Sequence, residues 1–377
     1  MKNDLHEFLE NYYKPHLIQG LASLSSDDIS KVSNEILDVV ENGGRIFAFG
    51  NGGSEAIAEH LLYALEFGIS DNYQFDTHGN PKTSYYIKTP IDKLFNPRIK
   101  RSARPGDLVF LISASGNSRN INNAAKLCRK MGIRTISISG DGAIVKLSDL
   151  PVMISLHDQQ ILEDITQVFI HMAVRILTDS FDRNYLNKIQ HGVEFVTASM
   201  IYEIAFDVFG AFKSGNTIRV DAPDSGAIAI SAGHTAHNFK WDAFQNARKR
   251  LSNNVHSGLF SYHLTGVSND GGEGFNLAVE VDDNCKKDDV EIVFAKDLND
   301  ARVQRVIKVA SSRFAKVHPV CFDVESEDIA ADLTQITGHI LGRTLNRIIA
   351  KSDLKSDLAL LRARDKTCCE FNRKYLV

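Results

Sequence analysis

The chain has 377 residues, of which 43% are hydrophobic and 24% charged, and 43 Lys and Arg against 47 Asp and Glu give a net charge of −4. This composition is ordinary for a folded protein of two or three domains, and it lacks the basic balance expected of a nucleic-acid-binding protein. No run of about 18 apolar residues predicts a membrane-spanning helix. The N-terminal segment MKNDLHEFLENYYKPHL is amphipathic and acidic, unlike a signal peptide. Scattered cysteines indicate reduced thiols, so we expect a cytoplasmic protein without nucleic-acid or membrane partners. These cysteines are Cys128, Cys285, Cys321, Cys368 and Cys369.

The first half alternates between strand and helix patterns. Apolar residues recur at helical spacing over about 25–42, 55–67, 120–131 and 160–177. Short apolar runs at 45–49, 107–112, 135–139 and 152–155 predict buried strands between these helices. Continuous apolar strands separated by helices are typical of a parallel sheet that is covered on both faces. The fold class is therefore α/β.

The second half repeats this plan. The segment D-I-T-Q-V-F-I-H-M-A-V-R at 164–175 returns as D-L-T-Q-I-T-G-H-I-L-G-R at 332–343, with His171 and His339 in register. A strand pattern at 289–294 likewise follows that at 107–112. Two unrelated helices would rarely share so many polar positions, so the sequence predicts a tandem duplication. We expect domains at 1–185 and 186–377.

Two loops of the first half carry candidate binding residues. The glycine-rich stretch 50–54 (GNGGS) follows the first strand, and the serine-rich stretch 113–118 (SASGNS) follows the second. Both lie at the carboxyl edge of the expected sheet, where ligands of such folds usually bind. Glycines let backbone N–H groups approach a ligand closely, and hydroxyls at a helix N-terminus suit a phosphate monoester. The expected substrate-binding residues are Asn51, Gly52, Gly53, Ser54, Ser113, Ser115, Asn117 and Ser118.

These loops exclude the common nucleotide motifs. The glycine spacing is not G-x-G-x-x-G, no acidic residue ends the next strand, and no G-x-x-x-x-G-K-[ST] occurs. We therefore expect no nucleotide cofactor. The purely structural alternatives are a tight turn for the first loop and a serine-rich helix cap without ligand for the second.

The second half lacks the glycines and serines of these two loops. Aligned through the repeat, the serine loop becomes Asp297-Leu298-Asn299-Asp300, and the glycine loop becomes 222–225 (APDS). Two carboxylates would repel a phosphate, and proline removes a backbone donor. One half is thus expected to bind a sugar phosphate and the other to be a degenerate structural partner.

FGNGGS, the following AEH, RPGD, SASGNSRN and the last helix with its histidine together resemble the SIS (sugar isomerase) domain over about 30–178. The phosphoheptose isomerase subfamily is the closest match, and 195–350 resembles a diverged second copy. This resemblance implies two flavodoxin-like αβα SIS domains with parallel sheets, arranged as an intramolecular pseudo-dimer. It also implies a homo-oligomer, since active sites of the family lie at subunit interfaces.

The resemblance assigns roles to further residues. Ser54, Ser113, Ser115, Asn117 and Ser118 would hold the sugar phosphate. His60, Glu163 and His171 stand at positions of the family's metal ligands or catalytic groups, which implies a Zn²⁺ site on these three side chains and acid–base roles for Glu163 and His171.

The chain departs from the family pattern at two positions. Ala64 replaces the family glutamate four residues after His60, and Glu163 replaces a glutamine. A 1,2-isomerisation needs a base that moves a proton between adjacent carbons, so Glu163 or His171 would take that role. Glu163 and His171 lie about 12 Å apart along one helix, too far to ligate one ion through straight side chains. His60 with one of the two would then bind metal, and the other would shuttle protons.

Each of these residues also has a structural interpretation. His60 could pack within its helix, His171 and His339 could share a role in a helix bundle between the repeats, and Glu163 could be a solvated carboxylate. His234 and His237, which share one helix with Lys240 and Trp241, either face the first repeat's site or form a polar helix surface.

The sequence thus favours an aldose–ketose isomerase that acts on a heptose phosphate such as sedoheptulose 7-phosphate, or on a related sugar phosphate. The alternative is a non-catalytic SIS protein that binds a phosphosugar or another protein. The missing glutamate favours this alternative, whereas the two loops with His60, Glu163 and His171 favour the enzyme.

Overall fold

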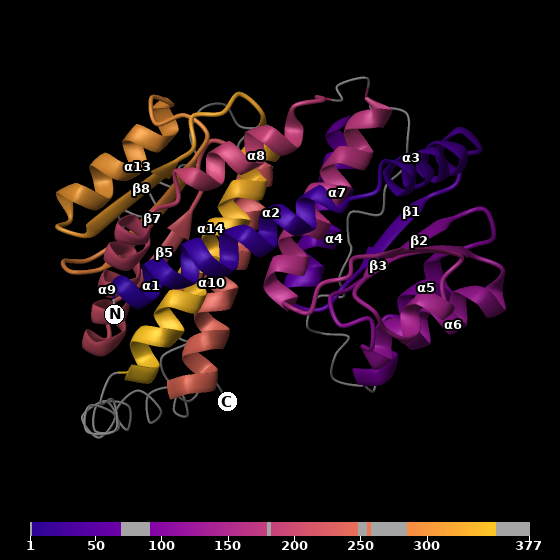
Figure 1. The fold of residues 1–377 in the computed structure, drawn as a ribbon, viewed down its shortest axis with the longest axis horizontal. Coiled ribbons are helices and arrows are strands. Elements are labelled where there is room, and N and C mark those ends of the chain that lie inside the picture. Colours follow the sequence, from indigo (N-terminus) through magenta and orange to yellow (C-terminus); the bar gives the residue numbers. More distant parts are fainter. Residues whose placement is uncertain (1, 69–90, 179–181, 248–254, 258–284, 352–377) are drawn as a thin grey trace, which may run out of the picture. The chain divides into compact units, whose positions relative to one another are not determined.

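The computed structural model describes residues 2–68, 91–178, 182–247, 255–257 and 285–351. The chain divides into two compact units (Figure 1). The first unit is Glu10–Val193, and the second unit combines Met1–Leu9 with Glu194–Val377. Each unit is described by itself.

The first unit is a parallel sheet with helices between its strands. The strands lie in the order β1-β2-β3-β4, and every neighbouring pair is parallel. Its elements, including the two that reach its ends, are the π-helix η1 (Leu9–Tyr13), α2 (Lys14–Ala22), α3 (Ser26–Glu41), β1 (Ile46–Phe49), α4 (Gly53–Gly68), the 3₁₀ helix η3 (Ile91–Lys93), α5 (Asn96–Ser102), β2 (Leu108–Ser113), α6 (Arg119–Met131), β3 (Arg134–Ser139), the 3₁₀ helix η4 (Ala143–Lys146), β4 (Leu150–Met153), α7 (Gln159–Leu177) and α8 (Tyr185–Glu194).

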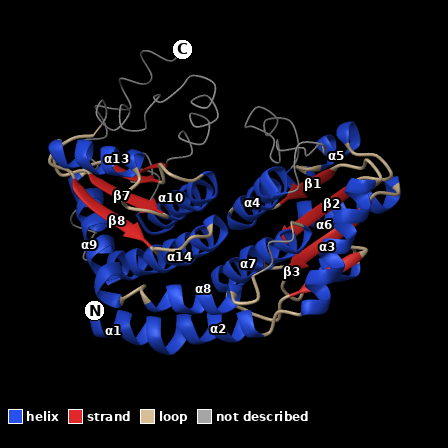
Figure 2. Cartoon of the chain, turned by 90° about the horizontal axis from the view of Figure 1, so that it is seen from above, coloured by secondary structure: helices blue, strands red, loops and turns tan. Residues whose placement is uncertain are grey.

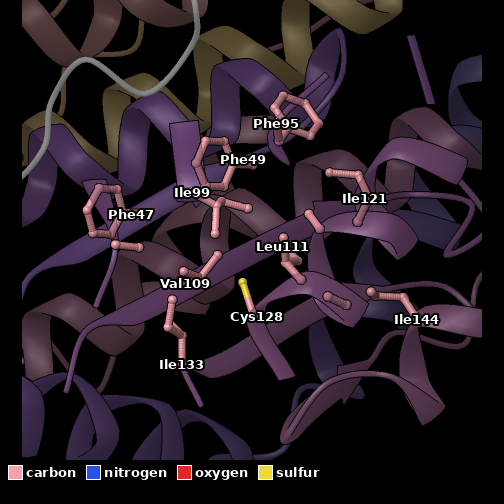
Figure 3. Close-up of a cluster of buried hydrophobic side chains, with 13 residues drawn as sticks. Phe47, Phe49, Phe95, Ile99, Val109, Leu111, Ile121, Cys128, Ile133 and Ile144 are labelled. Carbon is pink, nitrogen blue, oxygen red and sulfur yellow. The ribbon is translucent and has the colours of Figure 1, made fainter. Parts of the chain in front are cut away.

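Both faces of this sheet are covered. Side chains alternate between the faces of a strand, and Phe47 and Phe49 of β1 pack with Val109 and Leu111 of β2 in one core cluster (Figure 3). Residues of α5 and α6 complete that cluster, whereas α3, α4 and α7 pack on one another and on the sheet. Every residue of β1 and β2 is buried, as expected for central parallel strands.

The second unit has the same plan. Its four described strands lie in the order β6-β5-β7-β8, again all parallel. Helices surround the red strands in each unit (Figure 2). Its elements are α1 (Lys2–Phe8), α9 (Ala198–Ser214), β5 (Ile218–Asp221), α10 (Gly226–Ala247), β6 (Val255–Ser257), β7 (Val290–Ala295), α13 (Ala301–Ser312), β8 (Lys316–Cys321) and α14 (Glu327–Lys351).

Contacts inside the units repeat as well. The carboxylate of Asp107, just before β2, accepts the backbone N–H of Arg45, just before β1, at 2.9 Å. In the second unit, Asp289 before β7 accepts the N–H of Thr217 before β5 at 2.8 Å. Because the same aspartate ties the same pair of strands in both units, these contacts support the duplication that the sequence predicts.

The repeats differ in the connection that precedes the last helix. In the first unit, 140–158 joins β3 to α7 and contains η4 and β4. In the second unit only 322–326 joins β8 to α14. The second unit therefore lacks the segment corresponding to η4 and β4.

The expected α/β class with two parallel sheets is confirmed. Most expected strands and helices end within one or two residues of the observed ones, and the strand expected at 152–155 lies at Leu150–Met153. Cys128, Cys285 and Cys321 are free thiols. Cys368 and Cys369 lie outside the described residues, as do the side chains of His237, Lys240 and Trp241.

Within the described residues, none of the helices is by itself long and apolar enough to cross a membrane. One pair, Tyr185–Glu194 with Ala198–Ser214, passes this test of length and composition together, with a bend of 67° between its helices.

Candidate active site

The glycine loop turns sharply between β1 and α4. A Cβ on Gly50 would lie 2.1 Å from the backbone oxygen of Ser54, so this close approach requires glycine. Gly52 has φ +57°, a left-handed conformation that also favours glycine. Ser54 is buried inside the turn. The three glycines thus fix a compact loop that brings backbone to the carboxyl edge of the sheet.

The serine loop follows β2 at the same edge. The hydroxyl of Ser113 donates to that of Ser118 at 3.2 Å, across a turn in which Gly116 has φ +63°. Within the described part of the chain, the backbone N–H groups of Ala114 and Ser115 make no hydrogen bond. Both residues are accessible to solvent. The loop therefore has solvent-accessible backbone donors beside serine hydroxyls.

Asn117 is part of the loop's internal support. Its Nδ2 donates to the backbone oxygen of Ser115 at 3.0 Å, and its Oδ1 accepts the backbone N–H of Ala143 at 3.1 Å. Gly142 packs against the backbone of Gly116, since a Cβ on Gly142 would lie 2.5 Å from the Gly116 carbonyl carbon. The segment before η4 thus braces the serine loop, and the second unit lacks this segment.

Asn120 joins the two loops. Its Nδ2 donates to Oδ1 of Asn51 at 2.7 Å, and Nδ2 of Asn51 donates to Oδ1 of Asn120 at 3.1 Å. The expected substrate-binding residue Asn51 therefore uses its side-chain amide to hold the glycine loop against α6. Sequence reasoning missed Asn120, although an amide in the first turn of a helix after a binding loop is a usable signal.

Glu163 belongs to α7, and its side chain lies against the first residue of α4, Gly53. A Cβ on Gly53 would fall 2.2 Å from Oε2 of Glu163, so the carboxylate rests directly against the glycine loop. Glu163 is buried, with 4% of its surface exposed, and the interpretation as a solvated carboxylate is wrong. The positive end of α4 favours a negative charge at this place.

His60 and His171 lie together, deeper in the unit. Their ring centroids are 5.4 Å apart in an edge-to-face arrangement, and both side chains are buried. His60 is seven residues along α4 from Gly53, or about 10 Å. The first unit therefore brings the two histidines together and places Glu163 about two helical turns away.

Three comparisons with known proteins bear on this site. A family model described as SIS domain matches residues 13–140. A phosphoheptose isomerase of Chlorobium phaeobacteroides is 33% identical over 156 residues, which make up 38% of this chain and 67% of that protein. A phosphoheptose isomerase of Chlorobaculum parvum is 30% identical over 152 residues, or 38% of this chain and 73% of that protein. The chain belongs to the SIS-domain family.

A likeness in fold extends beyond the residues that the family model matches. A solved glucosamine-6-phosphate deaminase of Thermotoga maritima aligns with 85% of this chain and 93% of its own, with a TM-score of 0.54 and 17% identity. At this identity the likeness shows the fold alone. It is consistent with the repeated element order of the two units.

The first unit also carries two carboxyl groups that sequence reasoning missed, those of Glu55 and Glu59. Burial raises the pKa of Glu59 to about 7. Burial, and then the charge of Glu59, raise the pKa of Glu55 to about 7 as well. The two residues are one turn apart on α4, and the spacing E-x-x-x-E on a helix between two buried elements was the available signal.

The second unit has its own histidine pair. The rings of His234 on α10 and His339 on α14 have centroids 4.9 Å apart, edge to face, and Gln335 lies 3.4 Å from Nδ1 of His234. Both histidines are buried, so the interpretation of His234 as part of a polar helix surface is wrong. The pair resembles that of His60 and His171 in its edge-to-face contact, although His234 lies two residues further along its helix than the position that matches His60.

Proposed function

We propose that this chain is a phosphosugar isomerase whose first unit binds the phosphate of an open-chain sugar at the serine loop. The observation that carries the proposal is that the backbone N–H groups of Ala114 and Ser115 make no hydrogen bond within the described chain. They lie in a loop that also carries three hydroxyls. Backbone donors with hydroxyls bind a phosphate monoester without needing lysine or arginine. Ser113, Ser115 and Ser118 supply the hydroxyls.

The proposed reaction interconverts an aldose and a ketose. A base removes a proton from the carbon beside the carbonyl group and returns it to the neighbouring carbon. Glu163 is the proposed base, because its carboxylate lies against the glycine loop at the same sheet edge as the serine loop. Its burial excludes water, which would compete for the proton.

The proposed substrate is a heptose phosphate such as sedoheptulose 7-phosphate, or a related sugar phosphate. The similarity to two phosphoheptose isomerases supports this choice. A homo-oligomer, a dimer in the simplest case, and a cytoplasmic location belong to the same proposal.

The donor chemistry of the histidine pair fits a zinc ion. Two buried imidazoles in edge-to-face contact offer two nitrogens of the kind that zinc prefers. His60 and His171 would hold the ion, with water completing its shell, and Glu163 would keep the role of the base. A bound zinc ion would supply Lewis-acid polarisation of a sugar oxygen.

A second candidate function is phosphosugar binding without turnover. Ala64 favours it, because a methyl group stands one turn after His60, where the family carries a glutamate. Such a protein would use the same loops and leave Glu163 as a charge that caps α4.

The experiment separates binding from turnover in one set of variants. Ser115→Ala should weaken sugar-phosphate binding by about fivefold, since a neutral hydrogen bond contributes about 1 kcal/mol. Ser118→Asp should abolish binding through charge repulsion. Glu163→Gln should keep binding in calorimetry and lose product formation. Unchanged affinity in both serine variants would contradict the phosphate site, and binding without product in the wild type would establish the second candidate.

A further inference from the structure

The loop after β7 in the second unit already holds a carboxylate. Asp224 lies between β5 and α10, and its Oδ2 accepts the backbone N–H of Lys296 at 2.8 Å and that of Asp297 at 3.2 Å. Lys296 and Asp297 are the first residues after the buried strand β7. An anionic side chain of the chain itself is therefore bound by the two donors at the end of this strand.

These two donors correspond to the open donors of the first unit. Ala114 and Ser115 follow β2 as Lys296 and Asp297 follow β7, in the same place of the repeat. In the first unit the loop from the neighbouring strand contains Gly52, which has no side chain to offer. Glycine at this place leaves the two N–H groups of the first unit without a carboxylate partner, whereas Asp224 accepts both N–H groups of the second unit.

Neighbouring contacts hold this arrangement in place. The Arg302 guanidinium pairs with Asp300 at 2.8 Å and also donates to the backbone oxygen of Asp224 at 3.1 Å. The N-terminus of α10 is occupied as well. Glu327 accepts the hydroxyl of Ser225 at 2.6 Å and the N–H of Ala227 at 3.2 Å.

We propose that Asp224 is a built-in occupant of a latent anion-binding site in the second unit, which keeps that unit closed to phosphate. Loss of this carboxylate frees the N–H groups of Lys296 and Asp297 for an external anion. The charge of Asp300 is balanced by Arg302, so it does not by itself bar a phosphate. This proposal concerns the second unit and does not depend on turnover in the first.

The test counts inorganic phosphate bound per chain by calorimetry. Ser118→Asp serves as the background, because it closes the first-unit site. In that background Asp224→Gly should bind one phosphate per chain, whereas Asp224→Asn should bind none. The asparagine is the matched control, since its amide oxygen still accepts both N–H groups. Asp224→Ser is measured in parallel, so that a folded variant is available if the glycine variant unfolds.

Two results would overturn the proposal. One is that the folded glycine and serine variants bind no more phosphate than the asparagine control. The other is that the full chain without substitution already binds phosphate at two equivalent sites. If the unsubstituted chain binds none, the proposed first-unit site fails, and a gain of one phosphate in Asp224→Gly would still support the latent site.

Discussion

The side-chain amides of Asn51 and Asn120 hydrogen-bond to each other in both directions, at 2.7 and 3.1 Å. One residue belongs to the glycine loop and the other to the first turn of α6, which the serine loop opens. The two loops of the candidate site are therefore held at a fixed separation by a pair that need not touch the ligand. Fixed loops reduce the ordering cost that binding would otherwise carry.

Asn120→Ala should weaken sugar-phosphate binding by about fivefold to thirtyfold, because two side-chain hydrogen bonds of about 1 kcal/mol each are lost. Calorimetry with the sugar phosphate measures the effect. Asn123→Ala is the matched control, since that amide donates to the backbone of Asp92 and not to the glycine loop. Equal losses in both variants would show that helix α6, and not the link to Asn51, controls affinity.

Gly142→Ala should displace the serine loop. Its new methyl carbon would lie within 2.6 Å of three backbone atoms of Gly116, and overpacking of this kind costs about 1–3 kcal/mol. We expect at least a fivefold loss of sugar-phosphate affinity. Gly132→Ala is the control. Gly132 ends α6 with φ +70° and has open space around it, so this substitution should lower the melting temperature and leave affinity unchanged. Wild-type affinity in Gly142→Ala would contradict the bracing role.

Glu59 makes the stability of the chain depend on pH. Its pKa in the folded chain is about 7, above the ordinary value of 4.5. Between about pH 4.5 and 7 the folded state therefore holds more protons than the unfolded state, and the free energy of unfolding falls as pH rises through this window.

Glu59→Gln removes this titration, so it should raise the melting temperature at pH 8 and change it little at pH 4.5. Thermal unfolding across this range checks the prediction. Glu66→Gln, at an exposed glutamate of the same helix, is the control and should leave the pH profile of the wild type intact. A Glu59→Gln profile parallel to the wild type would show that burial does not hold the proton.

Zinc binding should depend on the histidine pair of the first unit. His60→Ala and His171→Ala should each lower the zinc content of the purified, zinc-saturated chain by one ion, as measured by elemental analysis. His6→Ala, at an exposed histidine of α1, should leave the content unchanged. A full zinc complement in both variants of the pair would rule out this site. The measurement does not rely on turnover.

The sequence predicts most of the fold because apolar patterns are local. The buried run at 108–113 and the helix at 159–177 follow from spacing along the chain, and the repeat of His171 as His339 follows from register. The burial of Glu163 and the link from Asn120 to Asn51 depend on which helix face meets a loop distant in sequence. Spacing within one helix does not carry that information.

The role of Asp224 in the second unit could likewise not be predicted from spacing along the chain. The sequence predicts that Asp297 and Asp300 exclude phosphate by their charge, because they stand where the first repeat has the hydroxyls of its serine loop. Asp224 does more, because it takes the backbone donors themselves. Its role appears only when the loops after β5 and β7 are seen side by side in space.

The short connection 322–326, which stands where the first unit has 140–158, changes how the loop after the central strand is held. In the first unit the serine loop is supported from one side, through Asn117 and Gly142. In the second unit the loop after β7 is tied to the chain by the carboxylate of Asp224, which accepts two of its backbone N–H groups. The same loop is thus rigid in both units, but support from one side leaves its donors accessible and a bond to the donors themselves does not.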